Sequence, residues 1–170
     1  YINGAWNDRV AQSYMDGDWV DWYAGQLYER GEEYADITGG ISLGTQDYSK
    51  AEKKADHILL SASASTNAAY SHATCYTNDV IDLTGHNTLK AVVYTETYGS
   101  LSGFVKLGIT DSQVNFSKPT EYREKEIDGT LSKNTGDVTL TYDISSVSGS
   151  YYVGIINRAN ATKVYAIILE

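Results

Sequence analysis

The sequence has 170 residues, enough for one domain whose core buries roughly 70% of the surface of the unfolded chain. Its 15 tyrosines and 15 glycines against a single proline favour half-buried strands and tight turns, so an all-β fold is expected. The formal charge of −9 repels phosphate backbones and argues against a nucleic-acid partner, and no apolar run of about 18 residues is present to insert into a membrane.

The first 34 residues contain an aromatic repeat. Residues 1–6 (YINGAW) and 14–19 (YMDGDW) read almost alike, and a fainter copy follows at residues 28–31. Asn-Gly and Asp-Gly favour type I′ hairpin turns, but an isolated hairpin is only marginally stable in water. We therefore expect residues 1–34 to form a stem of short β-hairpins that packs on itself, on the main domain or on another subunit. The residues expected to mediate this stem packing or oligomerisation are Tyr1, Trp6, Tyr14, Trp19 and Trp22.

Residues 35–170 are expected to form the main domain, because short alternating or apolar runs are separated there by turn residues. The clearest central strand is 88–98. Antiparallel strands with short links and no alternating helices predict a two-sheet β-sandwich, most simply a jelly roll. The runs expected to form strands are 57–62, 71–77, 88–98, 104–109, 122–127, 138–142, 151–156 and 164–169.

Three charged or polar stretches have competing interpretations. Residues 49–52 fit a helix capping box, which allows a short helix over 50–56, yet a solvated loop leading into a strand at His57 is favoured. The alternating charges of residues 121–126, with Glu121, Glu124 and Glu126, are typical of an edge strand that resists aggregation. Residues 128–129 (Asp-Gly) have a strong turn preference and are expected to end that strand.

One catalytic pattern is present, the G-x-S-x-G of residues 40–44. A hydrolase would need Ser42 on a strained turn between a strand and a helix, with an acid and a histidine following in the chain. No series of strand and helix units accompanies the motif, so a serine in a glycine-rich strand is the favoured interpretation. The sequence does not support enzyme activity, and a hydrolase acting through Ser42 remains only a third hypothesis.

Metal ligands and reactive thiols receive little support. The histidines, His57, His72 and His86, are widely spaced and are expected to be solvated or to lie in turns. The single cysteine, Cys75, lies in an apolar run and is expected to be a passive core thiol. No cofactor is predicted. Calcium is a less favoured alternative, with loop aspartates as ligands at Asp111, Asp128 and Asp137.

The chain resembles a known family in its turn and strand signatures. After the opening repeats, the stretches that carry the likeness are 36–40 (DITGG), 56–63 (DHILLSAS), 81–85 (IDLTG), 142–145 (YDIS) and 148–154 (SGSYYVG). They resemble C-terminal modules of tail-tip, baseplate or fibre proteins from phages and prophages of Gram-positive bacteria, with a jelly roll similar to carbohydrate-binding modules. The resemblance implies a virion or extracellular component, often a homotrimer among other tail subunits, that binds glycan on the host surface. It implies no particular binding residue.

The start at Tyr1, without a methionine, suggests a piece of a longer protein. The leading hypothesis is a non-catalytic tail module that binds cell-wall polysaccharide or another glycan. The alternative is a purely structural or oligomerisation module of the tail that binds no sugar. Sugar rings stack on aromatic faces while polar groups bond their hydroxyls. Candidates for such contacts, at expected strand ends or loops, are Tyr98, Tyr122, Arg123, Asn157 and Arg158.

Overall fold

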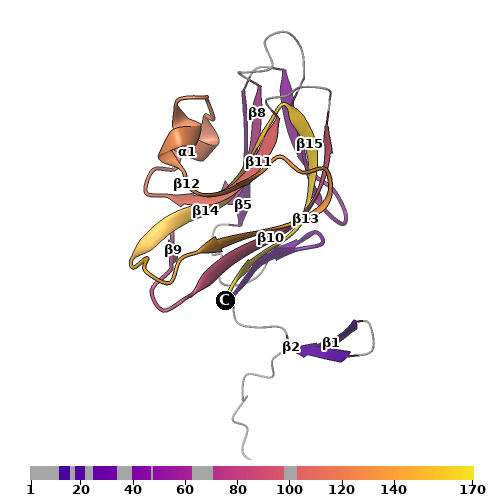
Figure 1. Cartoon of the computed structure of the whole chain (residues 1–170), viewed down its shortest axis with the longest axis vertical. Coiled ribbons are helices and arrows are strands. Elements are labelled where there is room, and N and C mark those ends of the chain that lie inside the picture. The colour runs from indigo at the N-terminus through magenta and orange to yellow at the C-terminus, as the bar shows by residue number, and fades with distance from the viewer. Residues whose placement is uncertain are drawn as a thin grey trace, which may run out of the picture.

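The computed structural model of the chain describes residues 12–15, 18–21, 25–33, 40–46, 48–62, 71–97 and 103–170. From residue 25 onward they form a β-sandwich of two antiparallel sheets, which confirms the predicted fold class (Figure 1). The seven-stranded sheet contains β3 (Gln26–Glu29), β4 (Glu32–Glu33), β6 (Ser49–Lys53), β7 (Ile58–Ala62), β10 (Thr88–Thr97), β13 (Gly136–Asp143) and β15 (Asn160–Leu169). The six-stranded sheet contains β5 (Ile41–Gln46), β8 (His72–Thr77), β9 (Ile81–Asp82), β11 (Phe104–Thr110), β12 (Asp128–Ser132) and β14 (Ser150–Arg158).

The central strand of the seven-stranded sheet is β15. One edge pairs with β10 along its length, and the other edge pairs first with β7 and then with β3. Thr162 lies opposite Leu60 of β7, and Ile167 lies opposite Tyr28 of β3. The strand therefore joins elements from both halves of the sequence into one sheet.

The main core lies between the two sheets and is built by the alternation of side chains along each strand. Leu107 and Ile155 come from the six-stranded sheet, and Ala91 and Val164 come from the seven-stranded sheet. Cys75 is fully buried among them, as expected for a core thiol, and burial raises the pKa of its thiol to about 12. The thiol is therefore held in its neutral, unreactive form.

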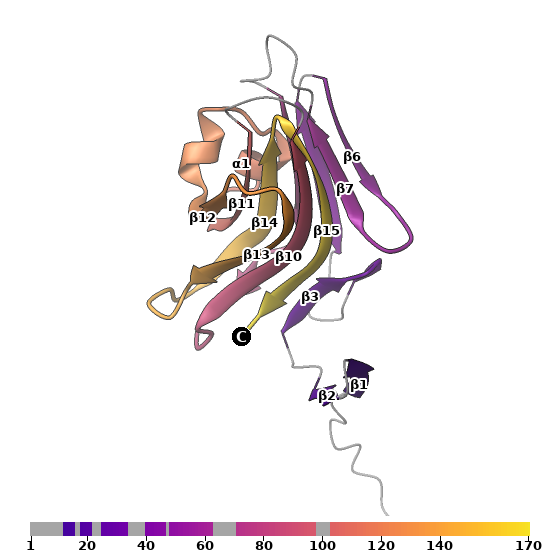
Figure 2. The same ribbon diagram turned by 45° about the vertical axis from the view of Figure 1, so that its right-hand side comes forward.

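A second, smaller cluster covers the outer face of the six-stranded sheet. The connection between β11 and β12, residues 111–127, carries the short helix α1 (Val114–Ser117) and the 3₁₀ turn η2 (Arg123–Glu126). Figure 2 shows α1 beside β11 and β12, on the side away from β10 and β15. The cluster consists of Tyr76, Phe104, Phe116, Ile127 and Ile156.

The connection packs tightly on β5 and β8. The hydroxyl of Thr74 donates to the carbonyl of Phe116 at 2.7 Å, and the rings of Tyr76 and Phe116 stack with centroids 5.7 Å apart. Gly44 lies directly beneath, where any Cβ would overlap the Phe116 carbonyl. Among the described residues, no helix is long and apolar enough to cross a membrane.

Three local predictions were wrong. Residues 123–126 form the 3₁₀ turn η2 and not a strand. Residues 128–129 begin β12 and are not a turn, because Gly129 fits closely against Gly108 of the neighbouring strand. Residues 49–53 are strand β6, neither helix nor loop, since Ala51 points to the core opposite Leu60 while its charged neighbours face outward.

The opening repeats are described only in part. β1 (Gln12–Met15) and β2 (Asp18–Asp21) form an antiparallel hairpin in which Tyr14 lies opposite Trp19. Tyr1, Trp6 and Trp22 lie outside the described residues. The third copy begins in β3, within the seven-stranded sheet, and ends in the turn of Arg30 and Gly31, and Tyr28 is part of the core. The division at residues 34 and 35 stays a prediction, but β3 and β4 pair with the sandwich.

The serine of the G-x-S-x-G motif lies inside a strand, β5, as the favoured interpretation predicts. Its hydroxyl donates to the side-chain oxygen of Asn78 at 3.1 Å. An extended strand is not the strand-to-helix turn on which a hydrolase presents its nucleophile.

Candidate functional site

A hollow of about 480 Å³ lies at one end of the sandwich. It is formed by the end of β11, the segment from η2 into β12, and the connection from β13 to β14, with Ile109 and Val147 as its apolar part. This volume is within the range of about 300 to 1,000 Å³ that is usual for small-ligand sites. Its polar and aromatic lining consists of Thr110, Asp111, Glu126, Asp128, Ser146, Ser148 and Tyr151.

The β13–β14 wall of the hollow is held by local hydrogen bonds. The carboxylate of Asp143 accepts from the backbone and hydroxyl of Ser145 at 2.9 and 2.7 Å, which lowers the pKa of Asp143. The amide of Val147 donates to the carbonyl of Ile144 at 2.8 Å, closing a turn. The amide of Gly149 donates to the hydroxyl of Thr84 at 3.0 Å. This wall is therefore formed before any ligand arrives, which lowers the cost of binding.

The β11 wall is held in the same way. The hydroxyl of Thr110 accepts from the side chain of the buried Asn115 at 2.8 Å and from the backbone of Ser112 at 3.3 Å. These bonds fix the path of the chain through Asp111, whose carboxylate is exposed at the hollow.

The hollow carries negative charge from the carboxylates of Asp111, Glu126 and Asp128. Tyr142 of β13 hydrogen-bonds Asp128, and its pKa is raised to about 12, first by burial and then by this contact. The phenol therefore stays protonated and donates to the carboxylate. The arrangement offers acceptors for hydroxyl or ammonium donors, together with serine and threonine hydroxyls and the ring of Tyr151.

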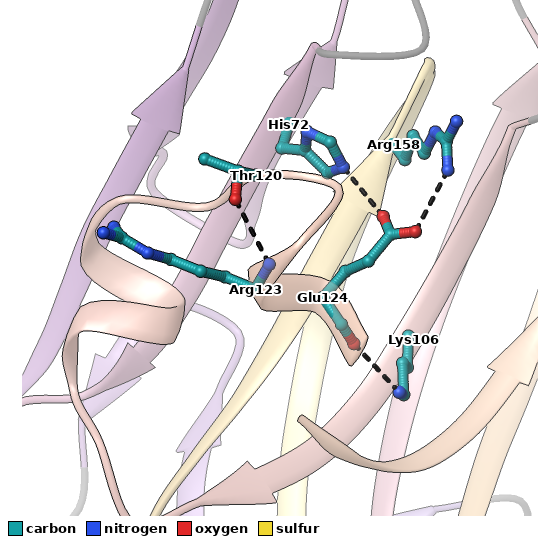
Figure 3. Close-up of polar contacts among 6 residues, drawn as sticks. All are labelled: His72, Lys106, Thr120, Arg123, Glu124 and Arg158. Carbon is teal, nitrogen blue, oxygen red and sulfur yellow. Dashed lines mark hydrogen bonds and ion pairs between the residues drawn. The ribbon is translucent and has the colours of Figure 1, made fainter. Parts of the chain in front are cut away.

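A buried ionic network ties the 3₁₀ turn η2 to the six-stranded sheet (Figure 3). The carboxylate of Glu124 lies 2.8 Å from Nε2 of His72 and accepts from Nη1 of Arg158 at 3.0 Å. The His72 side chain is fully buried, and the side chains of Arg158 and Glu124 are only 13% and 12% exposed. The guanidinium also lies 5.7 Å from the centre of the Phe104 ring. The 3₁₀ turn is thus tied through Glu124 to strands β8 and β14.

A second tie runs from β11 to the same turn. Nζ of Lys106 donates to the carbonyl of Glu124 at 3.2 Å and to the carbonyl of Ile127. Partial burial lowers the pKa of Lys106, and the nearby carboxylates of Asp128 and Glu124 oppose this shift. Lys106 therefore holds the end of η2 and the start of β12 with charge-assisted bonds.

The four sequence-predicted ligand residues that the structure describes do not gather at one surface. Tyr98 lies outside the described residues, and Tyr122 is 72% exposed on the surface of the 111–127 connection. Arg123 donates to the carbonyl of Lys118 at 2.8 Å and so braces its own connection. Asn157 is fully buried in β14, and Arg158 belongs to the ionic network.

Asn157 serves the fold. Its amide nitrogen donates to the carbonyls of Leu60 and Asn160 at 3.1 and 2.7 Å, and its oxygen accepts from Thr162 at 2.9 Å. All three bonds are buried, so the side chain does not reach a surface where a sugar would lie.

Sequence reasoning missed most of the hollow and all of the network. The sequence suggested Asp111 and Asp128 as loop or turn residues and as less favoured calcium ligands. The structure brings these two together at the hollow, while Asp137 lies in β13. In the parts of the chain that the structure describes, no three His, Cys, Asp or Glu side chains are grouped as a metal ion would need. The expectation of a solvated His72 was wrong, because Glu124 of a distant connection covers it.

No protein-family model matches the sequence, and no curated protein matches it. Solved structures with a similar fold include the metal-free carbohydrate recognition domain of Emp46p, with a TM-score of 0.53 at 9% identity, covering 85% of this chain and 94% of that one. The carbohydrate recognition domain of Emp47p has a TM-score of 0.52 at 11% identity, covering 85% and 93%. A mutant of a family 29 carbohydrate binding module has a TM-score of 0.50 at 8% identity, covering 85% and 89%. The likeness is one of fold.

Proposed function

We propose that the protein is a non-catalytic glycan-binding module that takes sugar in the hollow beside Tyr151. The observation that carries this proposal is the convergence of one aromatic ring, several hydroxyls and three carboxylates in a preformed hollow of about 480 Å³. The sandwich that bears the hollow has the fold of domains described as carbohydrate recognition domains and carbohydrate binding modules, which supports the same class of ligand.

The chemistry of the lining suits a polyhydroxylated ligand. The carboxylates of Asp111 and Asp128 accept hydrogen bonds from sugar hydroxyls, and such charge-assisted bonds are stronger than neutral ones. The hydroxyls of Ser146 and Ser148 both donate and accept. The ring of Tyr151 supplies an apolar face for the C–H groups of a pyranose.

The proposal extends to the biological setting. The turn and strand signatures of residues 36–40 and 148–154 support a tail-tip, baseplate or fibre module of a phage of Gram-positive bacteria. In that setting the glycan is cell-wall polysaccharide, the module lies in the virion, and other tail subunits surround a homotrimer.

A second candidate function is a structural or oligomerisation module of the tail. The observation that favours it is the hairpin of β1 and β2, which pair only with each other among the described strands. A two-stranded hairpin is marginal alone and gains stability by packing on a neighbour.

Titration of the whole chain with purified wall polysaccharide from Gram-positive hosts, by calorimetry, tests the first candidate. We expect binding by the wild-type chain and a loss of at least about tenfold in affinity for Tyr151→Ala, since about 1.4 kcal/mol corresponds to tenfold. Tyr48→Asn is the matched control, because Tyr48 is 78% exposed with φ of 52°, which asparagine tolerates.

The same titration separates the alternatives. A loss in Tyr122→Ala with none in Tyr151→Ala would move the site to the 111–127 connection. Absence of binding by a correctly folded chain would favour the structural candidate. Ser42→Ala tests the hydrolase hypothesis, and we expect neither polysaccharide cleavage by the wild type nor any change in binding.

A further inference from the structure

We propose that Glu124 is a positioning residue for the hollow, which it shapes through the buried contacts with His72 and Arg158. The inference rests on the proposed function, because it assigns a residue that controls the same site. Glu124 itself does not line the hollow, whereas Glu126 and Asp128 of the same segment do.

The first step of the argument is that Glu124 has one well-defined position. Its two carboxylate oxygens are occupied by different strands, one by His72 of β8 at 2.8 Å and the other by Arg158 of β14 at 3.0 Å. Figure 3 shows the carboxylate reaching from the turn to both partners. If the Glu124 carboxylate moved away, the nearly buried guanidinium of Arg158 would keep its positive charge without a partner. The contact therefore strongly favours a single position of the Glu124 side chain.

The second step links this position to the hollow. A 3₁₀ helix has about 3.0 residues per turn, so side chains two positions apart are rotated by roughly 240°. When Glu124 faces the sheet, Glu126 is turned away from it, at the rim of the hollow. Fixing the first carboxylate therefore fixes the direction of the second.

The third step concerns Asp128, which follows the turn directly. Lys106 holds the carbonyls of Glu124 and Ile127, so the backbone enters β12 at a fixed point. Glu124 and Lys106 together thus define the β12 wall, in the same way that Asp143 and Thr84 define the opposite wall.

The fourth step separates positioning from folding of the whole connection. Phe116 and Ile127 are buried in the outer cluster, and Thr74 holds the Phe116 carbonyl at 2.7 Å. These anchors do not depend on Glu124. Its loss is therefore expected to release the turn of residues 123–126 and to leave α1 in place.

The test compares Glu124→Gln with Glu121→Gln in the full chain. Glutamine in place of Glu124 turns an NH₂ group toward one of the two donors, whereas the control removes the same charge from the same segment outside the network. We expect Glu124→Gln to lower the affinity for wall polysaccharide by at least about tenfold and Glu121→Gln to change it by less than about twofold. Calorimetry measures both.

A ligand-free measurement keeps the inference distinct from the proposed function. In amide NMR spectra without sugar, we expect Glu124→Gln to shift the signals of Asp128 and of Ile109, its partner on β11 in the hollow, and to leave the signals of β10 unchanged. Unmoved hollow signals would overturn the positioning role, whether or not the wild type binds polysaccharide. Shifted signals with unchanged affinity would also overturn it.

Two further outcomes concern a wild type that binds no polysaccharide and a variant that does not fold. If the wild type binds no polysaccharide while Glu124→Gln still shifts the hollow signals, the proposed function fails and the positioning role stands. If Glu124→Gln does not fold, His72→Leu removes one of the two ties and keeps the Arg158 pair. It is expected to shift the same signals, and unmoved signals there would overturn the inference.

Discussion

Replacing Asn157 with alanine should destabilise the sandwich and leave sugar affinity unchanged. The Asn157 amide joins three elements inside the molecule, because it bonds the carbonyl of Leu60 in β7 and both Asn160 and Thr162 of β15. Alanine keeps the backbone pairing of β14 but supplies no partner for these groups.

The size of the loss follows from the bonds that are broken. The carbonyls of Leu60 and Asn160 lose their bonds from the Asn157 amide, whereas the Thr162 hydroxyl keeps its contact with the Thr95 hydroxyl at 3.3 Å. Each buried polar group left unsatisfied costs about 1 to 3 kcal/mol. Water entering the space that alanine leaves would recover part of this, so we take the lower value for each of the two carbonyls and expect about 2 kcal/mol. For a chain of 170 residues, this corresponds to a fall in Tm of about 4 to 8 °C.

Thermal unfolding followed by circular dichroism measures this loss, and urea titration at 25 °C gives the free energy of unfolding directly. Asn78→Ala is the matched control, because Asn78 is exposed and should lose less than about 1 kcal/mol. A loss below about 1 kcal/mol in Asn157→Ala, or a folded variant with weakened sugar binding, would refute the structural role assigned to this amide.

Three further predictions concern the core, the outer cluster and the stem. Burial raises the pKa of the Cys75 thiol and the Tyr142 phenol to about 12, from ordinary values of 9.0 and 10.0, so the unfolded state releases these protons first. Stability should hold up to about pH 9 and fall toward pH 12, as denaturant titrations at each pH will show. Gly44→Ala should cost about 1 to 3 kcal/mol in the same titrations, because its Cβ would displace the outer connection. Light scattering should show that deleting residues 1–24 converts a trimer into a folded monomer, whereas deleting 1–34 removes β3 and abolishes folding.

Much of the sandwich could be predicted because its central strands are buried in a regular pattern. The runs at 88–98, 151–156 and 164–169 contain the apolar, β-branched and aromatic residues that such strands require, and β10, β14 and β15 form there. The pattern of apolar residues along these runs is a local property of the sequence, and it indicates that the strands contact a core.

The errors arose where a distant partner decides the local structure. The alternating charges of residues 121–126 resemble an exposed strand, yet Glu124 is drawn inward by His72 and Arg158, which lie 52 and 34 residues away. The sequence carries no local sign of these partners. Similarly, β6 becomes a strand only because β7 offers it an edge.

The hollow could not be found from spacing, because no single segment contains it. Asp111, Glu126, Ser148 and Tyr151 come from connections and strand ends that the sheet topology brings to one place. What the sequence did indicate was one kind of group involved, since aspartates in loops between strands were expected.

The pairing of β15 also has a consequence for the order in which the chain can fold during synthesis. β10 pairs with one edge of β15, and β7 and β3 pair with its other edge. All three strands leave the ribosome long before residues 160–169. Until those ten residues have been made, the seven-stranded sheet lacks its middle, and the nascent chain exposes strand edges that can pair with other chains. A translational pause shortly before residue 160 would therefore promote aggregation more than a pause after residue 169 would.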